Sequence, residues 1–193
     1  MSNIQFIKNT NLQDPSVLQS AFRLRNETFK HRLGWEVSSH NGLEVDQFDE
    51  MNVSHITMTD HNNEVIGYWR ALPTTEPYML SEIFPQLLRG EEVPQGTDIW
   101  EISRFNVKKG SGNHSNKVIS HICSSLVKSF YDFAIDNGIS SYVLVTTVAC
   151  ERILRLLGVE TRRLGDGQAM MVGIERSVAL WIDVGEHLNI RCN

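Results

Sequence analysis

The sequence predicts an α/β sandwich built around a largely antiparallel sheet. Apolar residues recur at helical spacing in two long segments, near 15–29 and within 115–137. Other short runs are rich in β-branched and aromatic residues and end at Gly, Pro or Asn, which is typical of strands. Because helices and strands are mixed along a chain of 193 residues without repeats or linkers, we expect one domain over 1–193.

The helices have recognisable ends. The first begins at Asp14-Pro15, since Asp is a favoured N-cap and Pro a favoured first residue, and its apolar stripe includes Arg25. The second covers 115–137 and stops before Gly138. Shorter helices are expected over 79–89 and 148–157.

The strands follow a mixed order between these helices. Segments 53–59 and 64–72 form a predicted hairpin around the turn Asp60–Asn63, and Pro73 ends its second strand. Further strands are expected over 97–107, 140–147, 159–164, 169–176 and 178–184. Segment 31–50 shows no clean period, so we expect a long ordered loop there, a common place for function.

The composition and the absence of certain motifs exclude several classes of protein. A formal net charge of -5 argues against a general nucleic-acid binder. Three cysteines and seven histidines without ligand spacing favour neither a disulfide framework nor a metal site. We find no secretory leader pattern and no apolar run of about 18 residues, so we expect a cytoplasmic protein without membrane insertion. Phosphate-loop, dinucleotide-binding and nucleophile-elbow motifs are absent.

The run Trp100-Glu-Ile-Ser-Arg-Phe105 places two charges inside a predicted buried strand. Glu101 and Arg104 are either an internal ion pair or a proton acceptor beside an anion-binding guanidinium. Residues three apart on a regular strand point to opposite faces. If both side chains serve one cleft, we expect a β-bulge between them.

The charged residues of the predicted loop also have two interpretations, one structural and one functional. Asp46 and Asp49 are either a capping or turn pair, or two carboxylates that bind a cationic group with Arg25 balancing them. Arg70 is either an amphipathic edge residue or a group that orients this acidic loop.

Aromatic and basic residues have two interpretations as well. Trp35 and Phe29 either pack the loop on the first helix or form a wall facing a cation, worth roughly 1–2 kcal/mol when desolvated. Within 152–163, only Glu160 opposes the arginines, which favours a solvated helix face or a dock for an acidic carrier. These arginines are Arg152, Arg155, Arg162 and Arg163.

Several spaced motifs occur together in a fixed order. They are Arg25-x-x-x-Phe29, Arg32-Leu-Gly-Trp35-Glu-Val, Glu44-Val-Asp46-x-Phe48-Asp49, the run from Gly67 to Leu80, Phe84-Pro-x-Leu-Leu88 and Trp100-Glu-Ile-Ser-Arg-Phe105. In these motifs the chain resembles acyl-homoserine lactone synthases, the LuxI-type autoinducer synthase family. The likeness is dense from about residue 22 to 107 and looser through 176.

This resemblance implies a three-layer fold like that of GNAT acyltransferases. It also implies S-adenosylmethionine as a substrate rather than a cofactor, and an acyl thioester donor, usually acyl carrier protein. The products would be a quorum-sensing N-acyl-homoserine lactone and methylthioadenosine. By the same resemblance Glu101 and Arg104 are catalytic. The S-adenosylmethionine site and its loop network would comprise Arg25, Phe29, Trp35, Asp46, Asp49 and Arg70.

The acyl donor needs an apolar channel and a docking surface. We expect the channel walls to include Phe105, Leu126, Leu144 and Thr146. Some members that make 3-oxo products carry a threonine where this chain has Leu144, which cannot hydrogen-bond a 3-oxo group, so an unsubstituted chain is favoured. Arg152 and Arg155 would meet the acidic carrier.

Two other functions fit parts of the sequence. A GNAT-type N-acyltransferase using acyl-coenzyme A would need a glycine-rich phosphate loop, and Lys108-Lys-Gly-Ser-Gly112 is a weak version. A non-catalytic module that binds acyl carrier protein or S-adenosylmethionine would tolerate loss of Glu101 or Trp35, yet both are present. Release of methylthioadenosine would distinguish the lactone route from both.

Overall fold

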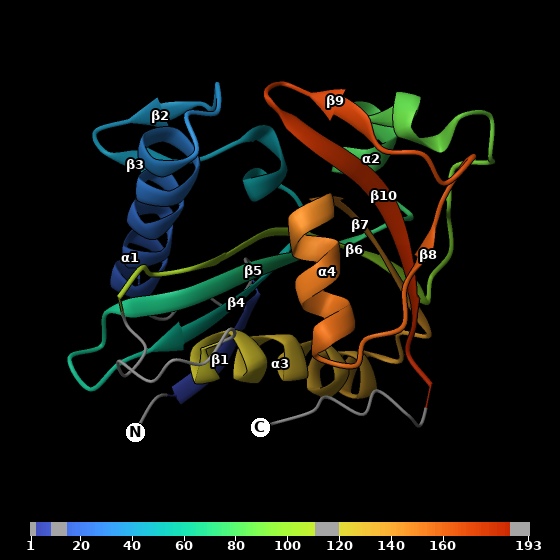
Figure 1. The fold of residues 1–193 in the computed structure, drawn as a ribbon. Helices are drawn as coiled ribbons and strands as arrows, with labels where there is room; N and C mark the ends of the chain where they lie inside the picture. Colours follow the sequence, from blue (N-terminus) through green and yellow to red (C-terminus); the bar gives the residue numbers. More distant parts are fainter. Residues whose placement is uncertain (1–2, 9–14, 111–119, 186–193) are drawn as a thin grey trace. The chain divides into compact units, whose positions relative to one another are not determined.

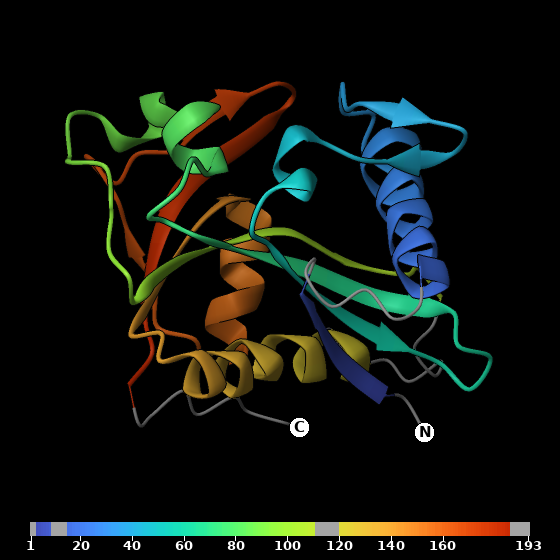
Figure 2. The ribbon, with the colours of Figure 1, turned by 180° about the vertical axis from the view of Figure 1, so that it is seen from behind.

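The computed structural model describes residues 3–8, 15–110 and 120–185. The chain forms two compact units, shown from opposite sides in Figures 1 and 2. The first unit contains the described residues of 1–71 and 104–126, and the second contains those of 72–103 and 127–193. No helix in the described ranges has both the length and the apolar character needed to cross a bilayer.

An antiparallel sheet forms the centre of the first unit. Strand β4 (Ser54–Thr59) pairs with β1 (Asn3–Lys8) on one side and with β5 (Val65–Pro73) on the other. Every residue of β4 and β5 is buried, so both faces of this hairpin are covered. The predicted strand–turn–strand unit is confirmed, with Pro73 as its last residue.

Helix α1 (Pro15–Arg25) packs on this sheet through Ala21 and Leu24, which share a buried cluster with Val65 and Tyr68 of β5. Its start at Pro15 agrees with the prediction, and Asp14 lies outside the described residues. Since Arg25 follows the buried stripe of α1, the helix carries this charged residue into the core.

The segment after α1 is more structured than the predicted loop. It continues as a π-helical turn, η2 (Asn26–Arg32), in which the Leu33 N–H donates to the Thr28 carbonyl at 3.0 Å. It then forms the hairpin β2 (Ser39–His40) and β3 (Leu43–Glu44) and a 3₁₀ turn, η3 (Gln47–Glu50). Figure 1 shows this hairpin beside α1. These pieces are too short to produce a periodic pattern in the sequence.

The second unit contains a mixed sheet. Its strand order is β6, β7, β10 and β8, and β9 also pairs with β10. Strands β6 and β7 are parallel, whereas β10 is antiparallel to its three partners. The predicted mixed, largely antiparallel sheet is therefore confirmed. The bounds are β6 (Ile99–Val107), β7 (Ser141–Thr147), β8 (Arg162–Arg163), β9 (Met170–Val172) and β10 (Glu175–Asp183).

The predicted helix 79–89 is interrupted. It consists of α2 (Met79–Glu82) and a 3₁₀ turn, η4 (Pro85–Leu88). Proline lacks a backbone N–H and disfavours helical geometry in the residue before it, and Phe84 has a ψ of 33°. One continuous helix over 79–89 was therefore the wrong prediction.

Two further helices complete the described structure. Helix α3 (His121–Asn137) ends before Gly138 as predicted, and 115–119 lie outside the described residues. Its second half is anchored in the second unit, because the Tyr142 hydroxyl donates to the Phe130 carbonyl at 2.8 Å. Helix α4 (Val148–Leu156) lies against β7 and β10 (Figure 1), and the Thr147 side chain caps it by accepting the Cys150 N–H at 3.2 Å.

Gly165 provides a test of packing in the second unit. A Cβ there would lie 2.7 Å from the Leu88 carbonyl oxygen, at a backbone φ of +65°. We expect Gly165→Ala to lower the free energy of unfolding by about 2–4 kcal/mol, since it adds a clash to the left-handed backbone cost. Gly173→Ala is the matched control, because φ there is +59° and nothing lies within 4 Å. Urea denaturation of both variants should show the larger loss at Gly165, and equal losses would contradict the close approach.

Candidate functional site

Six charged side chains of the first unit form one network. Three guanidinium groups face three carboxylates, and the residues come from α1, β3, the segment at η3, β5 and β6. Their hydrogen bonds and ion pairs link them without a break. The members are Arg25, Glu44, Asp46, Asp49, Arg70 and Arg104.

Arg25 and Arg70 are fully buried and hold the two aspartates. Arg25 binds Asp49 through two parallel hydrogen bonds, Nη1 to Oδ1 at 2.7 Å and Nη2 to Oδ2 at 2.9 Å. Arg70 donates from Nη1 to both aspartates, at 2.6 Å to Asp46 Oδ1 and 2.7 Å to Asp49 Oδ1. Paired donors of this kind give the strongest and most directional contacts between guanidinium and carboxylate. The prediction that Arg25 balances the two aspartates is confirmed.

Asp46 and Asp49 also cap η3. The Asp46 side chain accepts the Phe48 N–H at 3.0 Å, and Asp49 Oδ2 accepts the Asp46 N–H at 2.8 Å. The interpretation as a capping turn is therefore confirmed, and the binding of a cationic ligand by this pair stays a prediction. The cations that the structure places there are the protein's own arginines.

The network keeps Asp49 and Arg70 charged. Burial alone would raise the pKa of Asp49, but the Arg70 and Arg25 guanidiniums outweigh burial and hold that pKa well below its usual range. Burial alone would lower the pKa of Arg70, and the attraction of Asp49 and Asp46 raises it instead. Neither Asp49 nor Arg70 therefore exchanges a proton near neutral pH.

Arg104 joins the network from β6. Its Nη2 donates to Glu44 Oε1 at 3.0 Å and lies 2.8 Å from Asp46 Oδ2. The backbone of Arg104 has a φ of +56°, a left-handed conformation that is unusual for a residue with a side chain. The strand thus departs from regular geometry at Arg104 itself, and the β-bulge expected between Glu101 and Arg104 stays a prediction.

The two aromatic candidates pack on each other. The rings of Phe29 and Trp35 stack with centroids 5.1 Å apart and planes 23° apart, and the Trp35 N–H donates to the Phe29 carbonyl at 2.8 Å. The Arg104 guanidinium lies 5.5 Å from the Phe29 ring centroid. Phe29 is buried and Trp35 is half-buried, so part of the Trp35 ring remains accessible.

Glu101 belongs to the second unit and is held by the backbone. Its carboxylate is buried, and Oε2 accepts the Met79 N–H at 2.9 Å while Oε1 accepts the Leu80 N–H at 2.7 Å. These two N–H groups belong to the first turn of α2. Hydrogen bonds to both oxygens favour the ionised carboxylate, the form that a general base needs.

The four candidates for the acyl channel divide between the units. Leu126 is fully buried in the first unit and packs against Gly67 of β5, and Phe105 is half-buried. Leu144 is buried in β7 of the second unit, opposite Leu180 of β10. Thr146 is half-buried on the same strand. Their role as channel walls stays a prediction.

The basic segment 152–163 has acidic partners outside it. The carboxylate of Glu151 is buried and binds two of its arginines, Arg155 at 2.7 Å and Arg163 at 2.6 Å. Arg162 pairs with Glu91 at 3.0 Å. Acids outside the segment, Glu151 and Glu91, therefore neutralise part of the positive charge of its four arginines. Arg152 and Arg155 are nonetheless exposed on α4.

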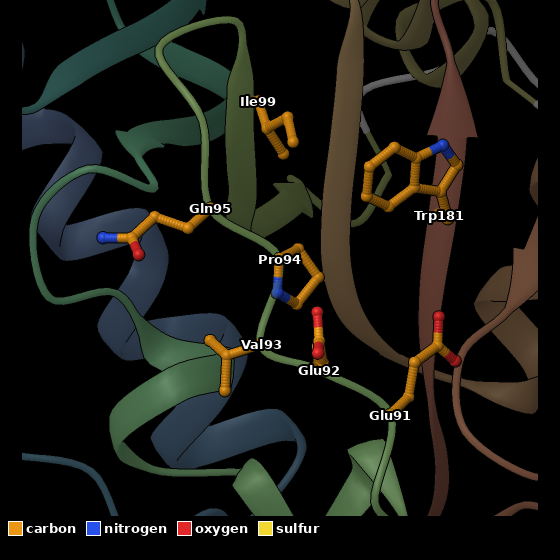
Figure 3. Close-up of a pocket in the computed structure, with 7 residues that line it drawn as sticks. All are labelled: Glu91, Glu92, Val93, Pro94, Gln95, Ile99 and Trp181. Atoms are coloured by element: carbon orange, nitrogen blue, oxygen red, sulfur yellow. The ribbon is translucent and has the colours of Figure 1, made fainter.

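Two pockets lie apart from these residues. Figure 3 shows one of about 580 Å³ in the second unit, where Trp181, Ile99 and Pro94 surround a space beside Glu92. Another, of about 450 Å³, lies in the first unit between residues of η2 and Lys108-Lys109. No predicted site residue lines either pocket. Among the described residues, no group of three or more His, Cys, Asp or Glu side chains is arranged to hold a metal ion.

The sequence interpretation missed three residues that complete the network. Glu44 binds two arginines, the Tyr68 hydroxyl lies 3.4 Å from Arg25 Nη1, and His55 Nδ1 lies 2.8 Å from that hydroxyl. Glu44 stands between Leu43 and Val45, so an acid among apolar neighbours was the available signal. For Tyr68 and His55 no such signal exists, since both residues are ordinary in strands.

Comparison with known proteins identifies the family. The autoinducer synthase family model matches residues 9–189. The chain belongs to this family. The acyl-homoserine-lactone synthase of Aliivibrio fischeri is 40% identical over 163 residues, which cover 84% of each chain.

Solved structures of autoinducer synthases share the fold. The crystal structure of the AHL synthase LasI aligns with a TM-score of 0.85 and 33% identity over 96% of this chain and 91% of that one. BjaI, a CoA-dependent acyl-homoserine lactone synthase with SAM and isopentyl-CoA, aligns with a TM-score of 0.86 and 25% identity over 98% of this chain and 86% of that one. The resemblance noted from sequence motifs is thereby confirmed.

His55 gives this autoinducer synthase a predictable pH dependence. Burial is the main cause that lowers the pKa of His55 from 6.5 to about 4, while Asp49 and Asp46 raise it and Arg25 and Arg70 lower it. Below pH 6.5 the unfolded chain therefore binds a proton that the folded chain does not. Stability should fall by about 3 kcal/mol as the pH drops from 6.5 to 4.

The measurement is chemical denaturation at several pH values. His55→Gln should be less stable than wild type at pH 7, with a much flatter dependence between pH 6.5 and 4. The Asp49 contribution is lost only at lower pH, since that pKa is depressed in the folded state. If the stability of His55→Gln declines as steeply between pH 6.5 and 4 as that of wild type, another group causes the pH dependence.

Proposed function

We propose that this chain is an acyl-homoserine-lactone synthase that uses S-adenosylmethionine and an acyl thioester to make a quorum-sensing signal. The observation that carries the proposal is the charged network with its adjoining aromatic pair. Together they contain all six residues that the resemblance assigns to the S-adenosylmethionine site, along with Glu44 and Arg104. Family membership and the SAM-bound relative BjaI support the same substrate.

The network acts by ordering the segment around η3. Arg25 and Arg70 neutralise Asp46 and Asp49, whose carboxylates in turn cap the turn. Trp35, which precedes the β2–β3 hairpin in the chain, is half-buried and offers an aromatic surface stacked on Phe29. A sulfonium or ammonium group is attracted to such a ring face, which suits the amine substrate.

Acyl transfer is the first of two bond-forming steps. The ammonium of S-adenosylmethionine must lose a proton before its nitrogen can attack the thioester carbonyl. Glu101 accepts this proton, directly or through a water molecule, and its two backbone hydrogen bonds hold the carboxylate in place. The tetrahedral intermediate then expels the thiol of the donor. Arg104 orients the substrate carboxylate or the carbonyl.

Lactone formation is the second step. The substrate carboxylate attacks its own γ-carbon, and the C–S bond breaks to release methylthioadenosine. The carboxylate and sulfonium charges disappear together in this step, so a dry pocket that holds the substrate bent accelerates it. No redox or metal cofactor enters this reaction scheme, and S-adenosylmethionine is consumed as a substrate.

The acyl donor is acyl carrier protein or acyl-coenzyme A. Its chain occupies a channel lined by Phe105, Leu126, Leu144 and Thr146, and Leu144 favours a chain without a 3-oxo group. Arg152 and Arg155 form the dock for an acidic carrier protein. We further propose that residues 1–193 work as one domain in the cytoplasm, with no nucleic-acid partner and no membrane insertion.

Glu101→Gln tests the base. A carboxamide cannot take up the proton, so turnover should fall about 100-fold or more while S-adenosylmethionine binding remains measurable by calorimetry. Methylthioadenosine release and lactone mass report the reaction. Full activity in this variant would overturn the base assignment.

Ser81→Ala is the matched control for Glu101→Gln. Ser81 Oγ accepts the Tyr78 N–H at 3.3 Å, so this variant weakens the same helix start and leaves the carboxylate intact. We expect it to lower the melting temperature while keeping most of the turnover. A loss of turnover as large as that of Glu101→Gln would show that Glu101 acts only through α2.

Arg152→Glu combined with Arg155→Glu tests the dock. Charge reversal should raise the KM for acyl carrier protein several-fold, most at low salt, and leave the KM for S-adenosylmethionine unchanged. Lys128→Glu, a charge reversal at an exposed position of α3, is the control. An unchanged KM for the carrier would move the dock to another surface.

A further inference from the structure

Glu44 is a fully buried acid whose side chain joins two arginines. Its exposed fraction is 0%, and it ends the short strand β3. Oε2 accepts a hydrogen bond from Arg25 Nε, and Oε1 accepts from Arg104 Nη2 at 3.0 Å and Nε at 3.2 Å. The carboxylate thus connects the end of α1 to the irregular residue of β6.

The charge count gives this carboxylate a second role. Arg25, Arg70 and Arg104 supply three positive charges, and Asp46 and Asp49 supply only two negative ones. Glu44 supplies the third and makes the network neutral. Without it, a buried guanidinium would lack a counter-charge, and the excess would act strongly on any ion nearby because the surrounding dielectric is low.

The contacts of Arg104 extend the effect of Glu44 to the aromatic pair. The Arg104 guanidinium lies 5.5 Å from the Phe29 ring centroid, and Phe29 stacks on Trp35. Glu44 and Asp46 are the acids that hold this guanidinium. Its position against Phe29 therefore depends on the Glu44 carboxylate.

We propose that Glu44 is a positioning residue of the S-adenosylmethionine site, and this inference rests on the proposed function. It holds Arg104 against Phe29 and keeps the network neutral. Neutrality matters for this substrate because its sulfonium and ammonium outnumber its single carboxylate. An uncompensated guanidinium nearby would repel it, whereas the acyl donor would be little affected.

Two substitutions separate the effect of the Glu44 charge from the effect of its side-chain length. Glu44→Gln keeps the shape and removes the charge, so the dissociation constant for S-adenosylmethionine should rise about tenfold or more, with the larger effect at low salt. The KM for the acyl donor should change less than about twofold. Glu44→Asp keeps the charge but is one methylene shorter, so it cannot reach both arginines in the same geometry. Its affinity for S-adenosylmethionine should stay near wild type while kcat falls.

Glu151→Gln is the matched control. Glu151 is also a buried glutamate between two arginines, Arg155 and Arg163, but it lies on α4 outside the network. Both Gln variants should lose stability in thermal denaturation, and only Glu44→Gln should lose affinity for S-adenosylmethionine in calorimetry. Equal affinities in the two variants would reduce Glu44 to a structural residue and overturn the inference.

The remaining outcomes are also decisive. If Glu44→Gln does not fold, Glu44→Asp still tests the charge argument, and a tenfold loss of affinity in that variant would contradict it. Wild-type protein that binds S-adenosylmethionine without releasing methylthioadenosine would refute the proposed reaction instead. Binding to the Glu44 variants would then still report on the positioning role.

Discussion

The constraint on which the first unit depends is that buried charge must be compensated. Arg25 and Arg70 have no exposed surface, and an ion buried without a partner costs several kcal/mol. Three carboxylates meet this requirement, and they can do so only when α1, β3, η3, β5 and β6 each present their charged residue to the same place. The network therefore selects one arrangement of short elements that have little stability of their own.

The structure holds its buried acids in two different ways. Glu44, Asp49 and Glu151 are neutralised by guanidinium groups, which suits residues that keep their positions. Glu101 is held by the N–H groups of Met79 and Leu80, which orient its carboxylate without adding a full positive charge. In the proposed reaction only Glu101 exchanges a proton. It can do so because its partners are backbone N–H groups, whereas the other buried acids are paired with guanidinium groups.

The fold was largely predictable from local patterns. The hairpin of β4 and β5, the strand β6 and the stop of α3 follow from alternation, β-branched residues and glycine. Two predictions were wrong for local reasons. The proline in the motif Phe84-Pro85 divides the expected helix, and 31–50 holds elements too short to show a period. The site residues were predicted from charges in apolar surroundings, and their motifs matched the family.

By itself the sequence predicted most of the residues that form the charged network, because unusual charges and spaced motifs are local properties. The tertiary structure alone decided the partners. Glu44 joins Arg25, which is 19 residues away, to Arg104, which is 60 residues away, and Arg162 finds Glu91 across 71 residues. Such pairings arise when distant segments fold against each other, and spacing along the chain carries no record of them. The left-handed backbone of Arg104 has the same origin, since only its packed surroundings can hold a non-glycine residue in that conformation.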